Sequence, residues 1–332
     1  MIEAPLLIFI GVGLALLFDF GNGLNDAANA VSTVVATRVL SLRKAVFLSA
    51  LGNFAGIFIF GVAVATTIGK GIILPEAVTP LIVVAGLVGS ILWVYLATYL
   101  GLPISASHAL IGGFIGSAVS AAGFGVVLYA GVLKVILFIF IAPLLGGFVA
   151  YLFQLFVFFV FRDAPRSRVN PWFRGLQILS ASTYSVSHGA NDAQKTIGII
   201  TILLFSGGVL GETFHVPFWV VVASYSTIAL GTLLGGARVI RTMGLQLTRL
   251  QPVNGFCAET AGSLVVIGST LAGIPVSTTH VITGAICGTG TVRRRSAVRW
   301  NLAKKIVYAW IVTIPVSALV GAGTYIVAHL FV

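Results

Sequence analysis

The sequence contains very little charge. Only 8% of its 332 residues are charged, whereas 58% are hydrophobic. A soluble domain usually carries about 25% charged residues, so this composition excludes a surface that faces water throughout. Several apolar runs approach or exceed the roughly 20 residues that span a bilayer. We therefore expect a membrane protein surrounded by the lipid bilayer. Examples of such runs are residues 45–68, 80–100, 128–161 and 306–332.

Cysteine is equally scarce, with only Cys257 and Cys287 in the chain. Two lone thiols in or beside apolar segments form neither a disulfide framework nor a metal site, and we expect them to pack as small apolar side chains. The sequence also lacks a nucleophile–base pair or a metal-ligand cluster of recognisable spacing. These absences argue against an enzyme, and they predict no resident cofactor or metal.

Positive charge is confined to a few short segments. The net charge of +11 would suggest a nucleic-acid partner in a soluble protein. Here all but three of the 19 Lys and Arg residues lie in four connections between apolar runs, as they do on the cytoplasmic side of membrane proteins. We therefore predict no nucleic-acid partner and place these connections in the cytoplasm. They hold Arg38, Arg43 and Lys44; Arg162, Arg166, Arg168 and Arg174; Arg238, Arg241 and Arg249; and Arg293, Arg294, Arg295, Arg299, Lys304 and Lys305.

This orientation predicts two halves that cross the membrane in opposite directions, with both termini outside the cytoplasm. The first apolar run begins after Glu3 without a basic region before it, so we expect a permanent helix and not a cleaved signal peptide. Three elements exceed one simple span and should be broken, tilted or re-entrant. The ten predicted elements are 5–37, 45–68, 80–100, 103–122 and 128–161, then 175–206, 216–236, 253–273, 275–290 and 306–331.

The sequence itself repeats between these halves. Asn22-Gly-Leu-Asn-Asp-Ala-Ala-Asn29 matches His188-Gly-Ala-Asn-Asp-Ala-Gln-Lys195, and residues 98–108 match residues 270–280. Inverted repeats with broken helices are typical of secondary transporters, whose binding site lies at the repeat interface. We therefore predict an all-α polytopic membrane protein with two inverted-topology repeats and about 10–12 membrane segments. The first repeat would be residues 1–161, the cytoplasmic linker 162–174 and the second repeat 175–332.

The Gly-x-Asn-Asp motifs place Asp26 and Asp192 inside apolar segments. An Asp there costs about 2.5–3.5 kcal/mol on insertion scales, so two at matched positions indicate function. Gly and Asn favour chain breaks, and an Asp at a break can neutralise a cation. The simpler alternative is an Asp that caps a re-entrant helix, which does not exclude cation binding.

The second repeated motif combines Pro with hydroxyl residues, at 103–108 and again at 275–280. Pro followed by Ser or Thr begins a helix well, and a helix N-terminus offers free N–H groups and positive dipole charge. With nearby hydroxyl donors, this end binds a small tetrahedral oxyanion without Arg. An ordinary helix N-cap is the alternative for either motif alone. Two roles fit His108, His188 and His280: proton transfer, or a hydrogen bond that orients the helix.

These motifs resemble those of the inorganic phosphate transporter family over nearly the whole chain. Gly255-Phe-Cys-Ala-Glu-Thr260, Arg294-Arg-Ser-Ala-Val-Arg-Trp300 and Trp310-Ile-Val-Thr-Ile-Pro315 resemble it too. The resemblance implies a central site for phosphate and a co-transported cation. It implies phosphate binding by Asn25, Ser105, Ser107, Asn191, Lys195, Ser277, Thr278 and Thr279, and cation or proton coupling by Asp26, Asn29, Asp192, Gln194 and Glu259.

Two departures from the sodium-coupled members bear on the coupling ion. Lys195 stands where the first repeat has Asn29, and Asn53 stands where many sodium-coupled members carry Glu. Lys does not coordinate sodium but can act as a fixed cation. In these features the chain resembles bacterial low-affinity members, which implies coupling to protons or transport of a neutral metal–phosphate complex.

We therefore expect secondary active import of inorganic phosphate by cation-coupled symport, across the inner membrane of a cell. Protons or a divalent metal bound to phosphate are favoured over sodium as the co-transported cation. The alternatives are sodium-coupled symport and transport of another tetrahedral oxyanion such as sulfate. A passive anion channel fits least, because acidic residues do not suit an anion pore. A homodimer is a further possibility that we leave open.

Overall fold

A computed structural model describes residues 4–59, 61–292 and 294–331 of the chain. These residues form α-helices, short 3-10 and π turns and no β-strand, which confirms the predicted all-α fold. Arg293 of the basic clusters lies outside the described residues. The helices are α1 (Ala4–Ala36), α2 (Leu42–Ala55), α3 (Ala63–Gly71), α4 (Pro80–Leu100), α5 (Ala106–Ala122), α6 (Tyr129–Val160), α7 (Arg166–Ser206), α8 (Phe218–Leu234), α9 (Ala237–Arg241), α10 (Pro252–Leu271), α11 (Thr278–Thr291) and α12 (Trp300–His329).

Four described helices, α1, α4, α6 and α12, are each long and apolar enough to cross a membrane. Two bent pairs raise this number to six if each pair is one span: α2 with α3, at 84°, and α8 with α9, at 65°. The predicted element over residues 45–68 therefore consists of two helices and not one. The apolar run is continuous in sequence, but the chain turns sharply between α2 and α3, so α3 packs against α7 in another direction.

The outside of the helix bundle is apolar, and its inside buries charged and polar side chains among the apolar core. Phe9, Leu144 and Leu319 are each more than 70% exposed. Asp26 and Lys195, in contrast, are at most 2% exposed. Such a surface suits lipid, and charged groups inside it mark a functional interior.

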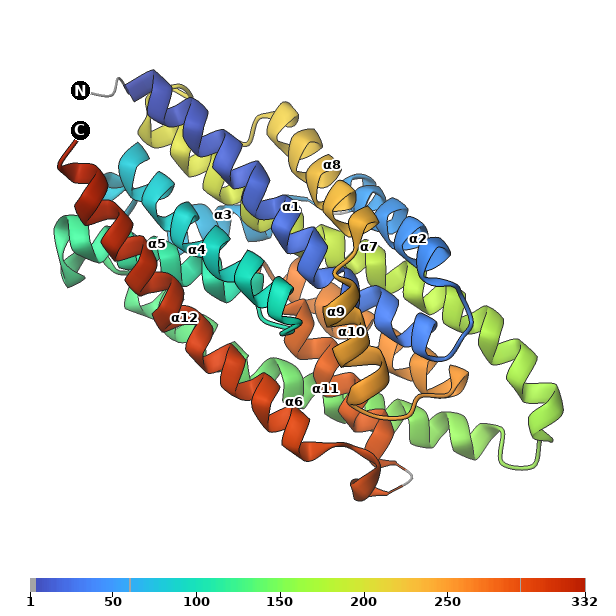
Figure 1. The fold of residues 1–332 in the computed structure, drawn as a ribbon. Coiled ribbons are helices and arrows are strands. Elements are labelled where there is room, and N and C mark those ends of the chain that lie inside the picture. The colour runs from blue at the N-terminus through green and yellow to red at the C-terminus, as the bar shows by residue number, and fades with distance from the viewer. Residues whose placement is uncertain (1–3, 60, 293, 332) are drawn as a thin grey trace.

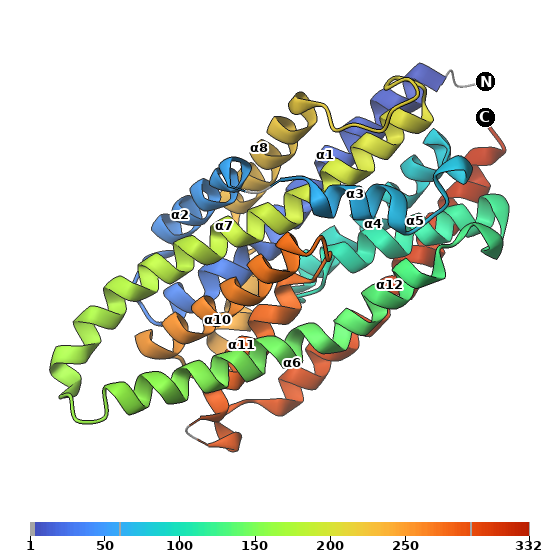
Figure 2. The same ribbon diagram turned by 180° about the vertical axis from the view of Figure 1, so that it is seen from behind.

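The two halves interlock with opposite directions. Figures 1 and 2 show α1 and α7 side by side and antiparallel, and α6 and α12 likewise run in opposite directions. Helices also pack across the halves in a reciprocal way, with α5 against α12 and α11 against α6. Two inverted repeats produce such reciprocal packing when each half buries its inner surface against the other half.

Each half contributes a helical hairpin whose tip reaches the centre of the molecule. The α4–α5 hairpin turns at Gly101 (φ 73°) and the α10–α11 hairpin turns at Gly273 (φ 64°). Only glycine adopts this left-handed conformation without strain. The hairpins enter from opposite ends of the bundle, and their tips meet beside α1 and α7 (Figure 1).

The predicted chain breaks at the Gly-x-Asn-Asp motifs are wrong, because α1 and α7 continue through them. The glycines serve close helix packing instead. A Cβ added at Gly23 would lie 2.2 Å from the carbonyl oxygen of Ile228 in α8, and one at Gly189 would lie 2.3 Å from that of Asn53 in α2. The chain instead reverses at the hairpin tips and bends between α2 and α3 and between α8 and α9.

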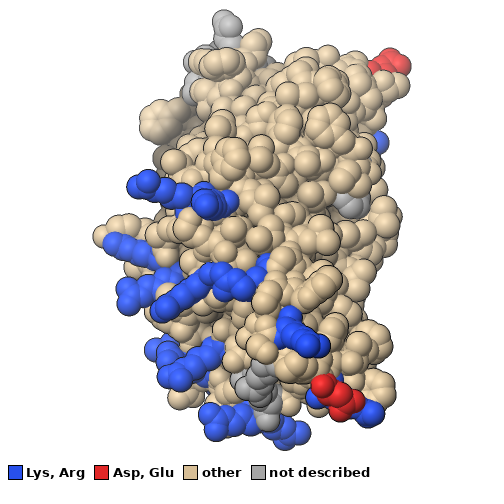
Figure 3. Space-filling model, turned by 90° about the vertical axis from the view of Figure 1, so that its right-hand side faces the viewer, with Lys and Arg blue, Asp and Glu red and all other residues tan. Residues whose placement is uncertain are grey.

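Basic side chains gather at one end of the molecule. Figure 3 looks at the right-hand side of Figure 1 and shows Lys and Arg dominating the charged groups there. The connections α1–α2, α6–α7 and α11–α12 lie at this end, away from both termini (Figure 1). Helix α7 begins at Arg166, so most of the predicted linker 162–174 forms its first turns. The division into two repeat domains remains a prediction.

Candidate functional site

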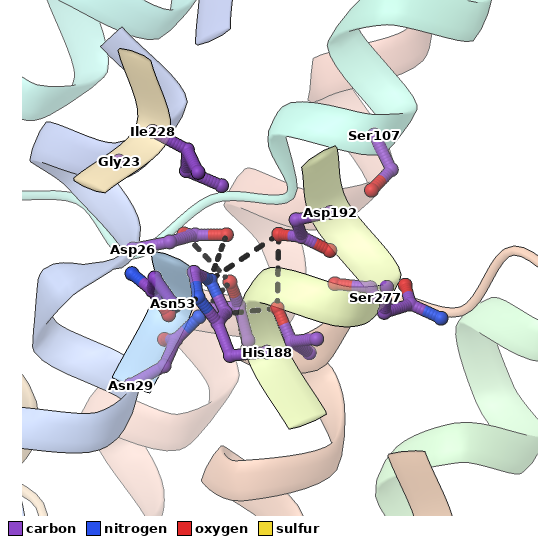
Figure 4. A network of polar contacts seen from close by, with 12 residues as sticks. Gly23, Asp26, Asn29, Asn53, Ser107, His188, Asp192, Ile228 and Ser277 are labelled. Atoms are coloured by element: carbon purple, nitrogen blue, oxygen red, sulfur yellow. Dashed lines mark hydrogen bonds and ion pairs between the residues drawn. The ribbon is translucent and has the colours of Figure 1, made fainter. Parts of the chain in front are cut away.

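Two carboxylates and an imidazole form the centre of the candidate site (Figure 4). His188 Nε2 lies 3.3 Å from Asp192 Oδ2 and 3.7 Å from Asp26 Oδ2. All three side chains are at most 3% exposed. Because α1 and α7 run side by side here, each repeat supplies one carboxylate. The ligand atoms of the three residues lie within 4.8 Å of one another, an arrangement that can hold a cation.

Asn53 fixes the orientation of the central imidazole. Its Nδ2 donates to Thr232 Oγ1 (2.8 Å), so its Oδ1 faces His188 Nδ1 at 3.0 Å. The amide oxygen accepts a hydrogen bond, which places a proton on Nδ1 and turns Nε2 toward the carboxylates. His188 therefore either bridges Asp26 and Asp192 as a cation or, when neutral, offers Nε2 to a bound cation.

Lys195 supplies a fixed positive charge at the same centre. Its Nζ, with the side chain 2% exposed, donates to Asp192 Oδ1 (2.5 Å), Ser107 Oγ (2.5 Å) and the carbonyl oxygen of Val276 (2.8 Å). These bonds use all three ammonium hydrogens. Ser107 belongs to the first hairpin tip and Val276 to the second, so Lys195 ties both tips to α7.

Hydroxyl groups of the second hairpin tip bond the two carboxylates. Thr279 Oγ1 donates to Asp26 Oδ1 (3.0 Å) and Thr278 Oγ1 donates to Asp192 Oδ2 (3.3 Å). Asn29 Nδ2 donates to Thr278 Oγ1 (3.3 Å) and to Thr279 Oγ1 (3.1 Å). The Asn29–Thr279 contact mirrors the Lys195–Ser107 contact, since each joins one repeat to the hairpin tip of the other.

The Pro-hydroxyl motifs begin helices as predicted. Ser105 Oγ accepts from His108 N (3.2 Å) at the start of α5, and Ser277 Oγ accepts from His280 N (3.3 Å) at the start of α11. Both helices therefore direct positive dipole ends and free N–H groups toward the centre. The rings of His108 and His280 meet edge to face at 4.8 Å, where the repeats face each other.

Asn25 and Asn191 brace each long helix against the hairpin of its own repeat. Asn25 Nδ2 donates to Thr98 Oγ1 (2.8 Å), and Asn191 Nδ2 donates to Thr270 Oγ1 (2.9 Å) at the matching positions. Their Oδ1 atoms are buried without a hydrogen-bond partner. These amides therefore offer oxygens to a cation more readily than donors to phosphate.

Gln194 and Glu259 make their hydrogen bonds to residues other than the two central carboxylates. Gln194 accepts from the backbone nitrogen of Val64 (2.9 Å) and donates to the carbonyl oxygen of Ala190, which caps α3 against α7. Glu259 accepts from Thr33 (2.5 Å), Gln177 (3.3 Å) and Ser180. None of these bonds involves Asp26 or Asp192.

Thr98, Thr232 and Thr270 had no assigned role in the sequence analysis, and it gave His188 and Asn53 no place in the binding site. The spacing of His188 and Asp192, four residues apart, would have placed both on one face of a continuous helix. The expected chain break concealed that signal. The contact of Asn53 and Thr232 with His188 carries no local signal, because only the packing of α2 and α8 brings them to the imidazole.

Comparisons with known proteins show what this chain is similar to. The sequence profile of the phosphate transporter family matches residues 22–321. A probable low-affinity inorganic phosphate transporter of Rhizobium meliloti (strain 1021) is 50% identical over 326 residues, covering 98% of this chain and 97% of the relative. One of Bacillus subtilis (strain 168) is 38% identical, covering 95% of both chains. A solved structure, described as the sodium-dependent phosphate transporter, is 26% identical with a TM-score of 0.88, covering 98% of this chain and 100% of that one.

Proposed function

The chain belongs to the phosphate transporter family, and from this premise we propose that it imports inorganic phosphate by cation-coupled symport. Protons or a divalent metal bound to phosphate are favoured over sodium as the partner cation. One observation carries the proposal: groups that can bind an anion surround the buried carboxylates of Asp26 and Asp192. These groups are the capped N-termini of α5 and α11, three hydroxyl groups at the hairpin tips and the Lys195 ammonium.

The donors at this centre suit phosphate. The helix ends of α5 and α11, the Ser107, Thr278 and Thr279 hydroxyls and the Lys195 ammonium can bond its oxygens. Asp26 and Asp192 are acceptors, and phosphate, unlike sulfate, still carries a proton near neutral pH. A carboxylate acceptor therefore favours phosphate over sulfate, because sulfate would leave it unpaired.

A cation is needed because the membrane potential opposes anion entry. Moving one negative charge inward against 100 mV costs about 2.3 kcal/mol. Phosphate is a monoanion or dianion near neutral pH, so it must enter with at least compensating positive charge. Asp26, His188 and Asp192 together can take up protons or hold the metal of a metal–phosphate cargo. Lys195 already occupies the place of a cation on the Asp192 side.

The closed arrangement suits alternating access between the repeats. Thr279 of the second hairpin bonds Asp26 of the first repeat, and Ser107 of the first hairpin bonds Lys195 of the second. If phosphate accepted hydrogen bonds from these groups, the bonds between each hairpin tip and the opposite repeat would break. The two hairpins, which enter from opposite ends, would then open the centre to one side at a time.

Sodium-coupled symport is the second candidate, favoured by the similarity to a structure described as a sodium-dependent phosphate transporter. Lys195 argues against it at the centre, because its ammonium bonds Asp192 directly.

Uptake of radiolabelled phosphate into proteoliposomes tests the proposal. We expect uptake driven by an inward proton gradient or stimulated by divalent metal, without a need for sodium and with little inhibition by sulfate. Protein-free liposomes and the variant Asp26→Asn are the controls, and both should lack driven uptake.

Each other outcome changes a stated part of the proposal. Uptake only with a sodium gradient would reject protons and metal–phosphate as the coupling cation. Strong competition by sulfate would move the substrate to another oxyanion. Non-saturable flux that follows the phosphate gradient alone would indicate a channel.

A further inference from the structure

Asp19 is a buried carboxylate that the central site does not use. It lies on α1, two helical turns before Asp26, and its side chain is 0% exposed. Neither Oδ1 nor Oδ2 has a hydrogen-bond partner among the described residues. A bare carboxylate is costly in an apolar interior, so this position calls for a bound positive charge or proton.

Several polar side chains near Asp19 carry buried oxygen atoms without a hydrogen-bond partner among the described residues. Asn22 and Thr196 are its polar neighbours, and Tyr225 of α8 lies within electrostatic range. The Oδ1 of Asn22, the Oγ1 of Thr196 and the hydroxyl of Tyr225 are buried and unbonded, as is the adjacent Ser224 Oγ. Three helices, α1, α7 and α8, thus direct unpaired oxygens to one buried place.

The basic groups of the interior are engaged elsewhere. Lys195 bonds Asp192, and His188 lies between Asp192 and Asp26. Asp19 makes no ion pair within 4.0 Å among the described residues. Its carboxylate therefore has no basic partner among the described residues, and a mobile cation can neutralise it.

We propose that Asp19, Asn22, Thr196 and Tyr225 form a binding site for a monovalent cation of the sodium type, separate from the Asp26–His188–Asp192 centre. A single carboxylate balances one positive charge, and the remaining ligands are neutral oxygens, which suit a hard cation and exclude soft metals. That this cation influences phosphate binding rests on the proposed function in phosphate transport; that the cation binds does not.

The position also gives the cation a means to affect the centre. Asp19 lies within electrostatic range of both Asp192 and His188. A cation at Asp19 cancels the repulsion between its carboxylate and Asp192, and so favours binding of an anion nearby. Sodium should therefore tighten phosphate binding, even though Lys195 fills the cation position at the centre.

Equilibrium binding of radiolabelled sodium to the purified full-length protein tests the site, first without phosphate. We expect saturable binding to the unaltered protein and its loss in Asp19→Asn. Thr196→Val and Tyr225→Phe keep the shape and the charge but remove one oxygen ligand, and each should weaken sodium binding about tenfold or more. Asp163→Asn removes an exposed carboxylate and should bind sodium normally.

Binding of radiolabelled phosphate to the same samples separates this inference from the proposed function. Phosphate binding retained in Asp19→Asn without its sodium enhancement would support the site and show that the variant is folded. Saturable sodium binding that survives Asp19→Asn but disappears in Asp26→Asn would overturn it, since the cation would then occupy the centre. Absence of sodium binding to the unaltered protein, with phosphate uptake intact, would overturn it as well.

Discussion

At the scale of single residues, the main difference between the two repeats is that the first has an amide where the second has an ammonium. Asn29 and Lys195 occupy matching repeat positions, and each bonds a hydroxyl of the opposite hairpin tip. Only Lys195 also bonds a carboxylate. One half of the centre therefore holds an ammonium against its carboxylate, whereas in the other half Asp26 has hydroxyl and imidazole neighbours.

Replacing Lys195 by Met should abolish phosphate uptake and destabilise the protein. The Asp192 carboxylate would remain buried without its cation, and breaking a buried pair costs about 3–5 kcal/mol. Thermal unfolding in detergent and proteoliposome uptake measure the two effects. The double variant Lys195→Met/Asp192→Asn should regain much of the stability but not the uptake.

Lys44→Met is the matched control, because Lys44 is an exposed side chain at the start of α2. It should leave unfolding and uptake unchanged. Near-normal uptake in Lys195→Met would contradict the role of Lys195 as a fixed cation in the site.

At the scale of the helices, small residues determine how closely the elements approach the centre. Gly23 lets α8 cross α1 beside Asp26, and Gly189 lets α2 cross α7 beside His188. The same crossings bring Thr232 and Asn53 to the imidazole. Continuous helices with glycine contacts thus position the carboxylates more rigidly than broken segments would.

Gly23→Ala should destabilise the protein by about 1–3 kcal/mol, because the new Cβ overlaps the Ile228 carbonyl and α8 must move. Gly13→Ala on the same helix meets no atom within 4 Å and should stabilise it by about 0.5–1 kcal/mol. Thermal unfolding of both variants in one detergent gives the comparison. An equal change in the two would show that helix propensity, and not the crossing, sets the need for glycine at position 23.

At the scale of the whole molecule, two interlocked halves give one centre reached from opposite ends. The basic end in Figure 3 contrasts with the end that holds both termini. Positive charge is retained on the cytoplasmic side of membranes, so the termini should lie outside the cytoplasm.

Thiol labelling of intact cells tests this orientation. In a background with Cys257→Ala and Cys287→Ala, Glu212→Cys between α7 and α8 should react with a membrane-impermeant reagent. Asp163→Cys, at the basic end between α6 and α7, should react only after the cells are lysed. Both positions are exposed, so access to the reagent decides the result. The reverse labelling pattern would place the termini in the cytoplasm.

The sequence by itself determined the membrane class, the all-helical fold, the repeated motifs and the family resemblance. Composition and apolar run length act locally, and the positions of Asp26, Asp192 and the Pro-hydroxyl motifs need no tertiary contact to be recognised. The starts of α5 and α11 were predictable for the same reason, since Ser105 and Ser277 cap their own helices.

Only the tertiary structure decided what Gly23 and Gly189 do, how the chain turns between α2 and α3, and which groups complete the site. A glycine allows either a chain break or a close helix crossing, and the partner helix, distant in sequence, selects between them. Asn53, Thr232 and the unpaired oxygens around Asp19 come together through packing of α2, α7 and α8. Such long-range contacts leave no periodic signal in the chain, so the sequence alone did not reveal them.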